Sequence, residues 1–332
     1  MNRRSGYTDG LLSGATWGVV AVLLPGAERL SGASLPATAT AVAAVFDAAA
    51  AVFMLARSGV VGALGDVARV LGSRRVLAVA ACSLLGGPLF MGGYVAAVIL
   101  AGPSDALTVT ALYPVVGALL AWSLLRQRLG RLGRVGVTVA ALGAALIAAD
   151  AGGGTADGQV LVGMMLALVA ATAVAGEGIV ATRAMAGLDE ATVMAVRELL
   201  SAVMFGLLLL AVPGGVGAVG MVVADPGLVL PVVGAGMVGA WSYVLWYRSI
   251  RTIGVARASA LNISYAMWGA LFAWGVYRTP MALLAIGGCV LVTAGAVATI
   301  LSGGHEPAAD GPPAEGGGSG IRCRRRRSGM TL

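Results

Sequence analysis

Four ionisable residues lie inside long apolar stretches of the sequence, where their chemistry would take place away from water. Asp47 sits in "PATATAVAAVFDAAAAVFMLA" with at least nine uncharged residues on each side, and Glu177, Arg197 and Glu198 occupy similar runs. A charged side chain at the centre of a bilayer costs about 2.5 to 3.5 kcal/mol on insertion scales, so such residues are by default candidates for function. A carboxyl group in that setting can gain and lose a proton during a transport cycle. Asp47 and Glu198 are therefore candidate coupling residues.

Arg197 and Glu177 each allow two interpretations. Neighbours on a helix lie about 100° apart, so Arg197 and Glu198 are not expected to face each other. Arg197 would then meet a partner on another helix, either Asp47 or a substrate carboxylate held by a bidentate contact. Glu177 lies about one and a half turns from a helix end, which favours contact with the membrane interface. A structural ion pair is the alternative to a functional role for the acids.

The composition excludes several kinds of chemistry. All 22 basic residues are Arg, the single histidine is His305 in a Gly/Pro-rich tail, and the three cysteines have no CxxC spacing. The absence of Lys removes P-loop nucleotide binding and Schiff-base cofactors. A Ser-His-Asp triad or a His-ligated metal would have to be built from the tail. We therefore expect no enzyme activity, no cofactor and no metal.

The hydropathy pattern predicts an all-α integral membrane protein with ten transmembrane helices. The chain is 58% hydrophobic and 11% charged, and a helix needs about 20 apolar residues to cross a bilayer. Placing both termini in the cytoplasm puts 19 of the 22 arginines on or near that side, as the positive-inside rule requires. The expected spans are 10–27, 36–56, 76–100, 104–125, 133–149, 159–182, 190–212, 227–247, 252–276 and 281–302.

The sequence contains an internal repeat. A shift of 152 residues aligns "ALYPVVGALLAWSLLR" with "ISYAMWGALFAWGVYR", and a shift of 151 pairs Asp47 with Glu198. Five helices per half is an odd number, so the second copy should lie upside down in the membrane, an arrangement found in secondary transporters. The expected parts are a first five-helix repeat (1–150), a polar connecting loop (151–158), a second repeat (159–302) and a disordered basic tail (303–332) whose arginines would lie against anionic lipid.

These stretches resemble a known family. The sequence "ALTVTALYPVVGALLAWSLLRQRLGRLGRVGVTVAALGAALI" looks like the fourth and fifth helices of an EamA repeat, "VRELLSAVMFGLLLL" resembles the second helix of such a repeat, and Trp17-Gly18 also fits. The resemblance implies a ten-helix member of the drug/metabolite transporter superfamily, most of which export small metabolites, amino acids or drugs. The Leu-Gly-Glu that usually follows the fourth helix is Leu125-Arg126-Gln127 here.

Aromatic residues divide by their expected depth in the membrane. Residues near the predicted helix ends are expected to form an interfacial belt and to have no transport role. They are Trp122, Trp246, Tyr247, Trp274 and Tyr277. Deeper residues on the third, fourth, eighth and ninth helices, with Trp17 on the first, predict a substrate cavity with stacking faces and a few polar tips. The predicted cavity residues are Trp17, Tyr94, Tyr113, Pro114, Trp241, Tyr243, Asn262, Tyr265 and Trp268. Pro88 and Pro114 should kink their helices.

The combined pattern predicts a secondary transporter in the cytoplasmic membrane. Its partners would be a small-molecule substrate, the lipid bilayer and a coupling proton, without nucleic acid, and a homodimer is compatible with the sequence. A non-transporting sensor or scaffold is the alternative. An integral-membrane lipid-modifying enzyme is a weaker one, because it needs clustered catalytic groups at a membrane face that the sequence does not offer.

Overall fold

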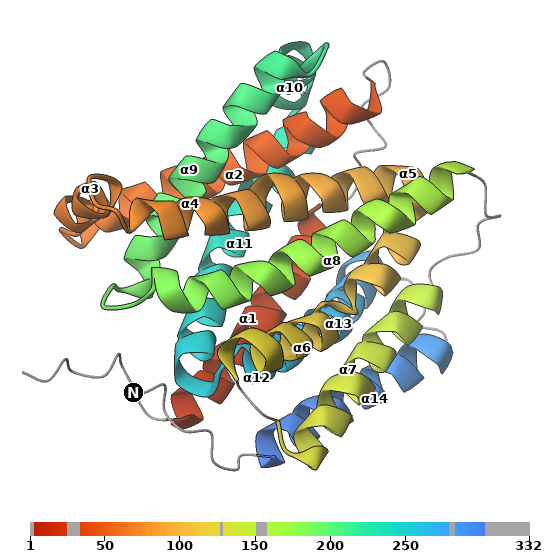
Figure 1. The fold of residues 1–332 in the computed structure, drawn as a ribbon. Coiled ribbons are helices and arrows are strands. Elements are labelled where there is room, and N and C mark those ends of the chain that lie inside the picture. Colours follow the sequence, from red (N-terminus) through yellow and green to blue (C-terminus); the bar gives the residue numbers. More distant parts are fainter. Residues whose placement is uncertain (1–2, 25–33, 127–128, 151–157, 279–282, 303–332) are drawn as a thin grey trace, which may run out of the picture.

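The computed structural model is a bundle of helices that cross one another in several directions (Figure 1). It describes residues 3–24, 34–126, 129–150, 158–278 and 283–302, and every regular element in those ranges is a helix. The elements are α1 (Arg3–Leu23), α2 (Leu35–Val60), α3 (Leu64–Leu71), α4 (Val76–Leu84), the π-helix η2 (Leu85–Gly92), α5 (Gly93–Thr110), α6 (Tyr113–Leu125), α7 (Arg131–Asp150), α8 (Gly158–Ala184), α9 (Glu190–Ala211), α10 (Gly215–Ala224), α11 (Pro226–Ile253), α12 (Val255–Asn262), α13 (Tyr265–Tyr277) and α14 (Leu283–Leu301).

The described helices agree with a membrane protein, although several differ from the expected spans. Five of the described helical segments are long and apolar enough to cross a bilayer, and they are Leu35–Val60, Val76–Ala101, Gly158–Ala184, Glu190–Ala211 and Pro226–Ile253. The count of ten spans and the cytoplasmic placement of the termini stay predictions. The connection 151–158, apart from Gly158, and the tail 303–332 lie outside the described residues.

The structure differs from the predicted helices in three places. The last residue of α11 is Ile253 instead of the expected 247, because Arg248 and Arg251 occupy the final turns of the helix instead of a loop. The expected loop near Gly102 and Pro103 is helical, and α5 runs through it. Two short helices, α3 and α10, were not predicted. Each of them follows the second long helix of a repeat.

Two membrane helices are interrupted near their middle. The third long segment changes at Leu85 from α-helix to the π-helix η2, which contains Pro88 and in which each backbone hydrogen bond joins residues five positions apart. The helix containing Pro114 stops at Thr110 and restarts at Tyr113, which places the proline in the first turn of α6. Proline lacks a backbone N–H and is tolerated at that position. Each proline therefore lies at a change of helix type or at a helix break, and the kinks themselves stay predictions.

The two halves repeat the same interruptions. The breaks before α6 and α13 occur 152 residues apart, and the bounds of α6 and α13 differ by 152 residues at both ends. Both helices end on an arginine with left-handed backbone geometry, Arg126 (φ 54°) and Arg278 (φ 56°), the only non-glycine residues with positive φ in the described ranges. An L-residue pays about 1 to 2 kcal/mol for that conformation, so its recurrence at equivalent positions marks a conserved backbone shape.

Helices α7 and α14 form a reciprocal contact between the halves. A Cβ added at Gly136 would lie 2.7 Å from the carbonyl oxygen of Gly295, and one added at Gly143 would lie 2.6 Å from that of Gly288. Since Gly136 and Gly143 are the counterparts of Gly288 and Gly295 at the 152-residue shift, the contact obeys a local twofold symmetry. Equivalent helices of the two repeats run in opposite directions here, as an inverted repeat requires. Small residues at the crossing let the backbones approach closely.

The centre of the molecule lies where the second helices of the two repeats, α2 and α9, pack together. The α4–η2 segment covers one side of this pair and α8 packs on that segment, while α11 contacts both α2 and α9 (Figure 1). The equivalent residues Asp47 on α2 and Glu198 on α9 are 1% exposed at this position. The fold therefore brings the predicted coupling residues of both repeats to its core.

Candidate functional site

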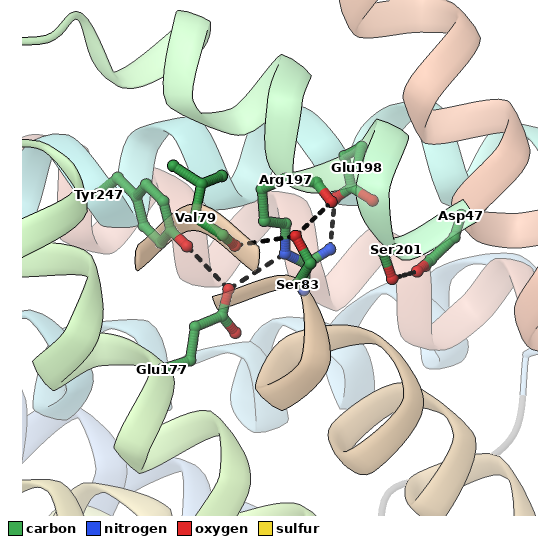
Figure 2. A network of polar contacts seen from close by, with 8 residues as sticks. All are labelled: Asp47, Val79, Ser83, Glu177, Arg197, Glu198, Ser201 and Tyr247. Carbon is green, nitrogen blue, oxygen red and sulfur yellow. Dashed lines mark hydrogen bonds and ion pairs between the residues drawn. The ribbon is translucent and has the colours of Figure 1, made fainter. Parts of the chain in front are cut away.

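A fully buried cluster of charged residues occupies this core (Figure 2). Arg197 on α9 donates from Nε to Glu177 Oε1 on α8 at 3.1 Å, and from Nη1 to Glu198 Oε1 at 2.7 Å. Tyr247 on α11 donates its hydroxyl hydrogen to the same Glu177 oxygen at 2.8 Å. The side chains of Arg197, Glu177 and Glu198 are at most 2% exposed, so water does not screen these ion pairs.

Asp47 extends the cluster on the α2 side. The hydroxyl of Ser201, one turn after Arg197 on α9, donates to Asp47 Oδ2 (Figure 2). The Ser83 hydroxyl of α4 lies 2.9 Å from the carbonyl oxygens of both Val79 and Arg197, which ties α4 to α9 at the same level. Five elements, α2, α4, α8, α9 and α11, thus meet around one polar centre.

The cluster has more acid than base. It contains three carboxyl groups and one guanidinium group, and each carboxyl has one buried oxygen without a hydrogen-bond partner among the described residues: Asp47 Oδ1, Glu177 Oε2 and Glu198 Oε2. A buried acceptor without a donor costs about 1 to 3 kcal/mol, more when it is charged. The site can therefore accept protons, or a cationic group of a solute, without first breaking an existing hydrogen bond.

Two glycines of the π-helix η2 pack directly against the cluster. A Cβ at Gly86 would overlap Arg197 Nη2 and Glu177 Oε2, and a Cβ at Gly87 would overlap Ser201 Oγ and lie 3.2 Å from Asp47 Oδ2. The backbone of η2 is therefore in direct contact with the charged groups. A change in the backbone conformation of η2 would therefore displace these side chains. In the same way, a movement of the charged side chains would displace the backbone of η2.

A group of aromatic rings adjoins the cluster through Tyr243. The Arg197 guanidinium carbon lies 4.8 Å from the centre of the Tyr243 ring, and that ring is 5.5 Å from Trp17. Trp17 also contacts Phe90 at 6.1 Å and Phe46 at 6.4 Å, and Phe90 stacks on Tyr94 at 6.2 Å. Three predicted cavity residues, Trp17, Tyr94 and Tyr243, are thus collected beside the ionic centre.

Other predicted cavity residues gather at the interrupted helices instead. The Tyr113 hydroxyl, on the first residue of α6, donates to Asn262 Oδ1 at 2.5 Å and lies 3.0 Å from the Ser259 carbonyl oxygen. Asn262 Nδ2 donates to Ser13 Oγ at 2.7 Å, and Ser242 Oγ donates to the Ser13 carbonyl oxygen at 2.8 Å. This chain of hydrogen bonds links α6 of the first repeat to α12 of the second.

The remaining predicted residues make other contacts. Trp241 contacts two arginines, Trp268 stacks on Phe272 with ring centres 5.8 Å apart, Pro114 is buried in the first turn of α6, and Tyr265 is 7% exposed at the start of α13. Their role in substrate binding stays a prediction.

The expectation that Arg197 and Glu198 do not pair was wrong. The 100° angle separates the Cβ directions of neighbouring residues, but the arginine side chain is long enough to curve round the helix and reach the glutamate at 2.7 Å. Arg197 does meet a partner on another helix, as expected, but that partner is Glu177 instead of Asp47.

The depth of three residues was also misjudged. Glu177 is 0% exposed instead of reaching the interface, and Tyr247 and Trp246, which were expected in an interfacial belt, are 0% and 3% exposed. Both expectations counted turns from a predicted helix end. Because α11 continues to Ile253, Tyr247 lies deeper than the expected boundary implied. Trp122 and Trp274 are 58% and 48% exposed, as expected for a belt.

The fold and this centre together define a multi-pass membrane protein with a buried ionic core, and comparison with known proteins places it among transporters. The chain belongs to the EamA-like transporter family, whose model matches residues 4–149 and again residues 161–301. The family resemblance seen in the sequence is thereby confirmed.

Two individual proteins illustrate the relationship. Protein LicB of Haemophilus influenzae is 22% identical over 223 residues, which cover 67% of this chain and 75% of LicB. A crystal structure of another protein, 20% identical, superimposes with a TM-score of 0.68 over 91% of this chain and 98% of its own. At that level of identity the structural match supports the fold alone.

Proposed function

We propose that this protein is a secondary transporter that exports a small metabolite, amino acid or drug across the cytoplasmic membrane by alternating access, with protons as the coupling ion. The observation that carries the proposal is the buried cluster of three carboxyl groups around one guanidinium group, each carboxyl with a free oxygen. Such a centre is costly to keep in a membrane core and is expected where ions or protons are exchanged.

The position of the cluster supports alternating access. Asp47 and Ser201 belong to different repeats, so their hydrogen bond joins the halves that must move relative to each other. Protonation of Asp47 removes the negative charge that favours this contact and reduces the excess of acid beside Arg197. Binding or release of a proton would then shift the balance between two arrangements of α2 and α9, because each arrangement pairs the charges differently.

The aromatic group offers a binding surface for the solute. Trp17, Phe46, Phe90, Tyr94 and Tyr243 supply ring faces beside charged groups, a combination suited to an amphipathic solute. The excess of carboxyl groups favours a cationic or zwitterionic solute. Tyr243 touches both the aromatic group and Arg197, so solute binding at the rings would be sensed at the ionic centre.

The test is transport of a pooled metabolite and drug mixture in proteoliposomes, loaded inside or outside, with and without an imposed pH gradient. We expect wild type to move a solute in response to the gradient and Asp47→Asn to lose that response while inserting and folding normally. Asp66→Asn is the matched control, because it makes the same chemical change at an exposed residue of α3.

Three outcomes would contradict parts of the proposal. Equal gradient-driven transport by wild type and Asp47→Asn would make Asp47 a structural residue. Gradient-independent movement in both would indicate facilitated diffusion or exchange. If wild type moves nothing in the mixture, the sensor or scaffold alternative gains support.

A further inference from the structure

Two arginines without an acidic partner share one tryptophan at the outer seam between α2 and α11. The guanidinium carbon of Arg57 lies 5.6 Å from the centre of the Trp241 ring, and that of Arg248 lies 5.8 Å from it. All three side chains are half-buried. The two guanidinium groups are therefore held at most about 11 Å apart, where like charges repel unless an anion lies between them.

Other arginines at this end of the molecule do have partners. Arg251 Nε lies 3.1 Å from Glu190 Oε1, and Arg69 pairs with Asp66. In the ranges that the structure describes, neither Arg57 nor Arg248 forms an ion pair or a side-chain hydrogen bond. Their ring contacts fix the direction of the guanidinium groups but leave the N–H donors available to a ligand.

The seam is continuous with exposed apolar residues of α11. Along α11, Leu230 is 69% exposed and Met237 is 40% exposed, and Trp241 follows one turn later on the same face. On α2, Ala49 contacts the position of Gly236, and Arg57 lies two turns further along the face that borders α11. The exposed apolar stripe ends at Trp241, Arg57 and Arg248. Apolar residues are thus followed by an aromatic ring and then by charges, as a bilayer changes from acyl chains to headgroups.

The level of the site in the membrane follows from the helix ends. Arg57 lies in the last turn of α2 and Arg248 near the end of α11. Gly236 lies against Ala49 and Trp241 against Arg57, so the two helices run in the same direction. The positive-inside rule assigns both ends to the cytoplasmic side, where the leaflet is rich in anionic lipid.

We propose that Arg57, Trp241 and Arg248 form a binding site for the phosphate of an anionic phospholipid at the cytoplasmic end of the α2–α11 seam. The guanidinium groups would donate to the phosphate oxygens, the indole would lie at the glycerol level, and the acyl chains would cover the stripe that contains Leu230 and Met237. Because α2 carries Asp47 and α11 carries Tyr243 and Tyr247, an occupied site would connect two of the helices that surround the ionic centre.

The test is a lipid titration of the detergent-solubilised full chain, read by native mass spectrometry. The probes are phosphatidylglycerol, phosphatidylcholine and inorganic phosphate. We expect wild type to prefer phosphatidylglycerol, and the double variant Arg57→Gln/Arg248→Gln to lose about thirtyfold in phosphatidylglycerol affinity. Arg69→Gln/Arg74→Gln is the control, since it removes the same charge from exposed residues of the same end.

Each alternative result has a defined meaning. Unchanged phosphatidylglycerol affinity in the double glutamine variant would overturn the site, and an equal loss in the control would reduce it to a general charge effect. Displacement of lipid by equimolar inorganic phosphate would show a free-anion site instead. Should the glutamine variant fold poorly, Arg57→Lys/Arg248→Lys keeps the charge without the planar fork, and we expect it to lose part of the affinity.

Discussion

The glycine pair of η2 determines how closely backbone can approach the buried charges. Gly86 and Gly87 lie directly against Arg197, Glu177 and Ser201, where a methyl group has no room. The π-helical geometry of this segment brings successive glycines into contact with the cluster. Single-turn π-helices occur frequently at functional sites, and here the distortion makes space for side chains that would otherwise clash.

Gly86→Ala should therefore destabilise the protein, whereas Gly92→Ala in the same π-helix should not. The Cβ at position 86 overlaps two charged groups, while at position 92 it meets Phe205 at 3.5 Å, an ordinary contact. Overpacking costs about 1 to 3 kcal/mol, and alanine regains up to about 1 kcal/mol of helix preference at an open position. The thermal unfolding midpoint in detergent measures both effects. A fall of equal size in the two variants would show that the glycines act through backbone freedom alone.

Residue burial was predictable where the sequence surrounds a charge with apolar neighbours. Asp47, Arg197 and Glu198 met that condition and are buried, but Glu177 and Tyr247 were assigned from their distance to a predicted helix end. Composition shows which residues are embedded in an apolar run, yet the depth of a residue depends on where its helix stops. The pairing of Arg197 with both glutamates depends on side-chain conformation, which spacing alone does not determine.

Helix interruptions were predictable at only one of two equivalent positions. Pro114 indicated the break before α6, but no proline occurs near the break at Ile263 and Ser264. The 152-residue shift does place that break opposite the first one, so the repeat contained the signal that residue chemistry did not. The left-handed helix end also recurs in the second repeat, at Arg278.

The α7–α14 crossing should be intolerant of larger residues at its contact positions. A Cβ at Gly143 lies 2.6 Å from backbone atoms of α14, whereas nothing lies within 4 Å of one at Gly287. We expect Gly143→Val to lower the unfolding midpoint and the monodisperse fraction in detergent, and Gly287→Val to leave both nearly unchanged, because backbone cannot yield as a flexible side chain does. Equal behaviour of the two variants would argue against close backbone packing at this crossing.

On the scale of the whole molecule, the equivalent arginines Arg126 and Arg278 should lie on opposite sides of the membrane. Both are exposed at matching helix ends, and the equivalent helices α7 and α14 run antiparallel, as expected for inverted halves. In a background with Cys82, Cys289 and Cys323 replaced by Ser, an impermeant maleimide added to intact cells should label Arg278→Cys and not Arg126→Cys. Permeabilised cells should show labelling of both. Labelling of both positions in intact cells would refute the inverted arrangement.

The reciprocal contact of α7 and α14 also bears on the origin of the chain. Gly136 contacts Gly295, and Gly143 contacts Gly288 in the same way. Each helix therefore uses equivalent residues to contact the other. A surface with that property is self-complementary, and two copies of a single five-helix polypeptide could associate through it. The present chain joins two related units of this kind in one polypeptide, each matched by the same family model. Arg197 and the two glutamates that it contacts all lie in the second unit, an asymmetry that a pair of identical subunits could not have.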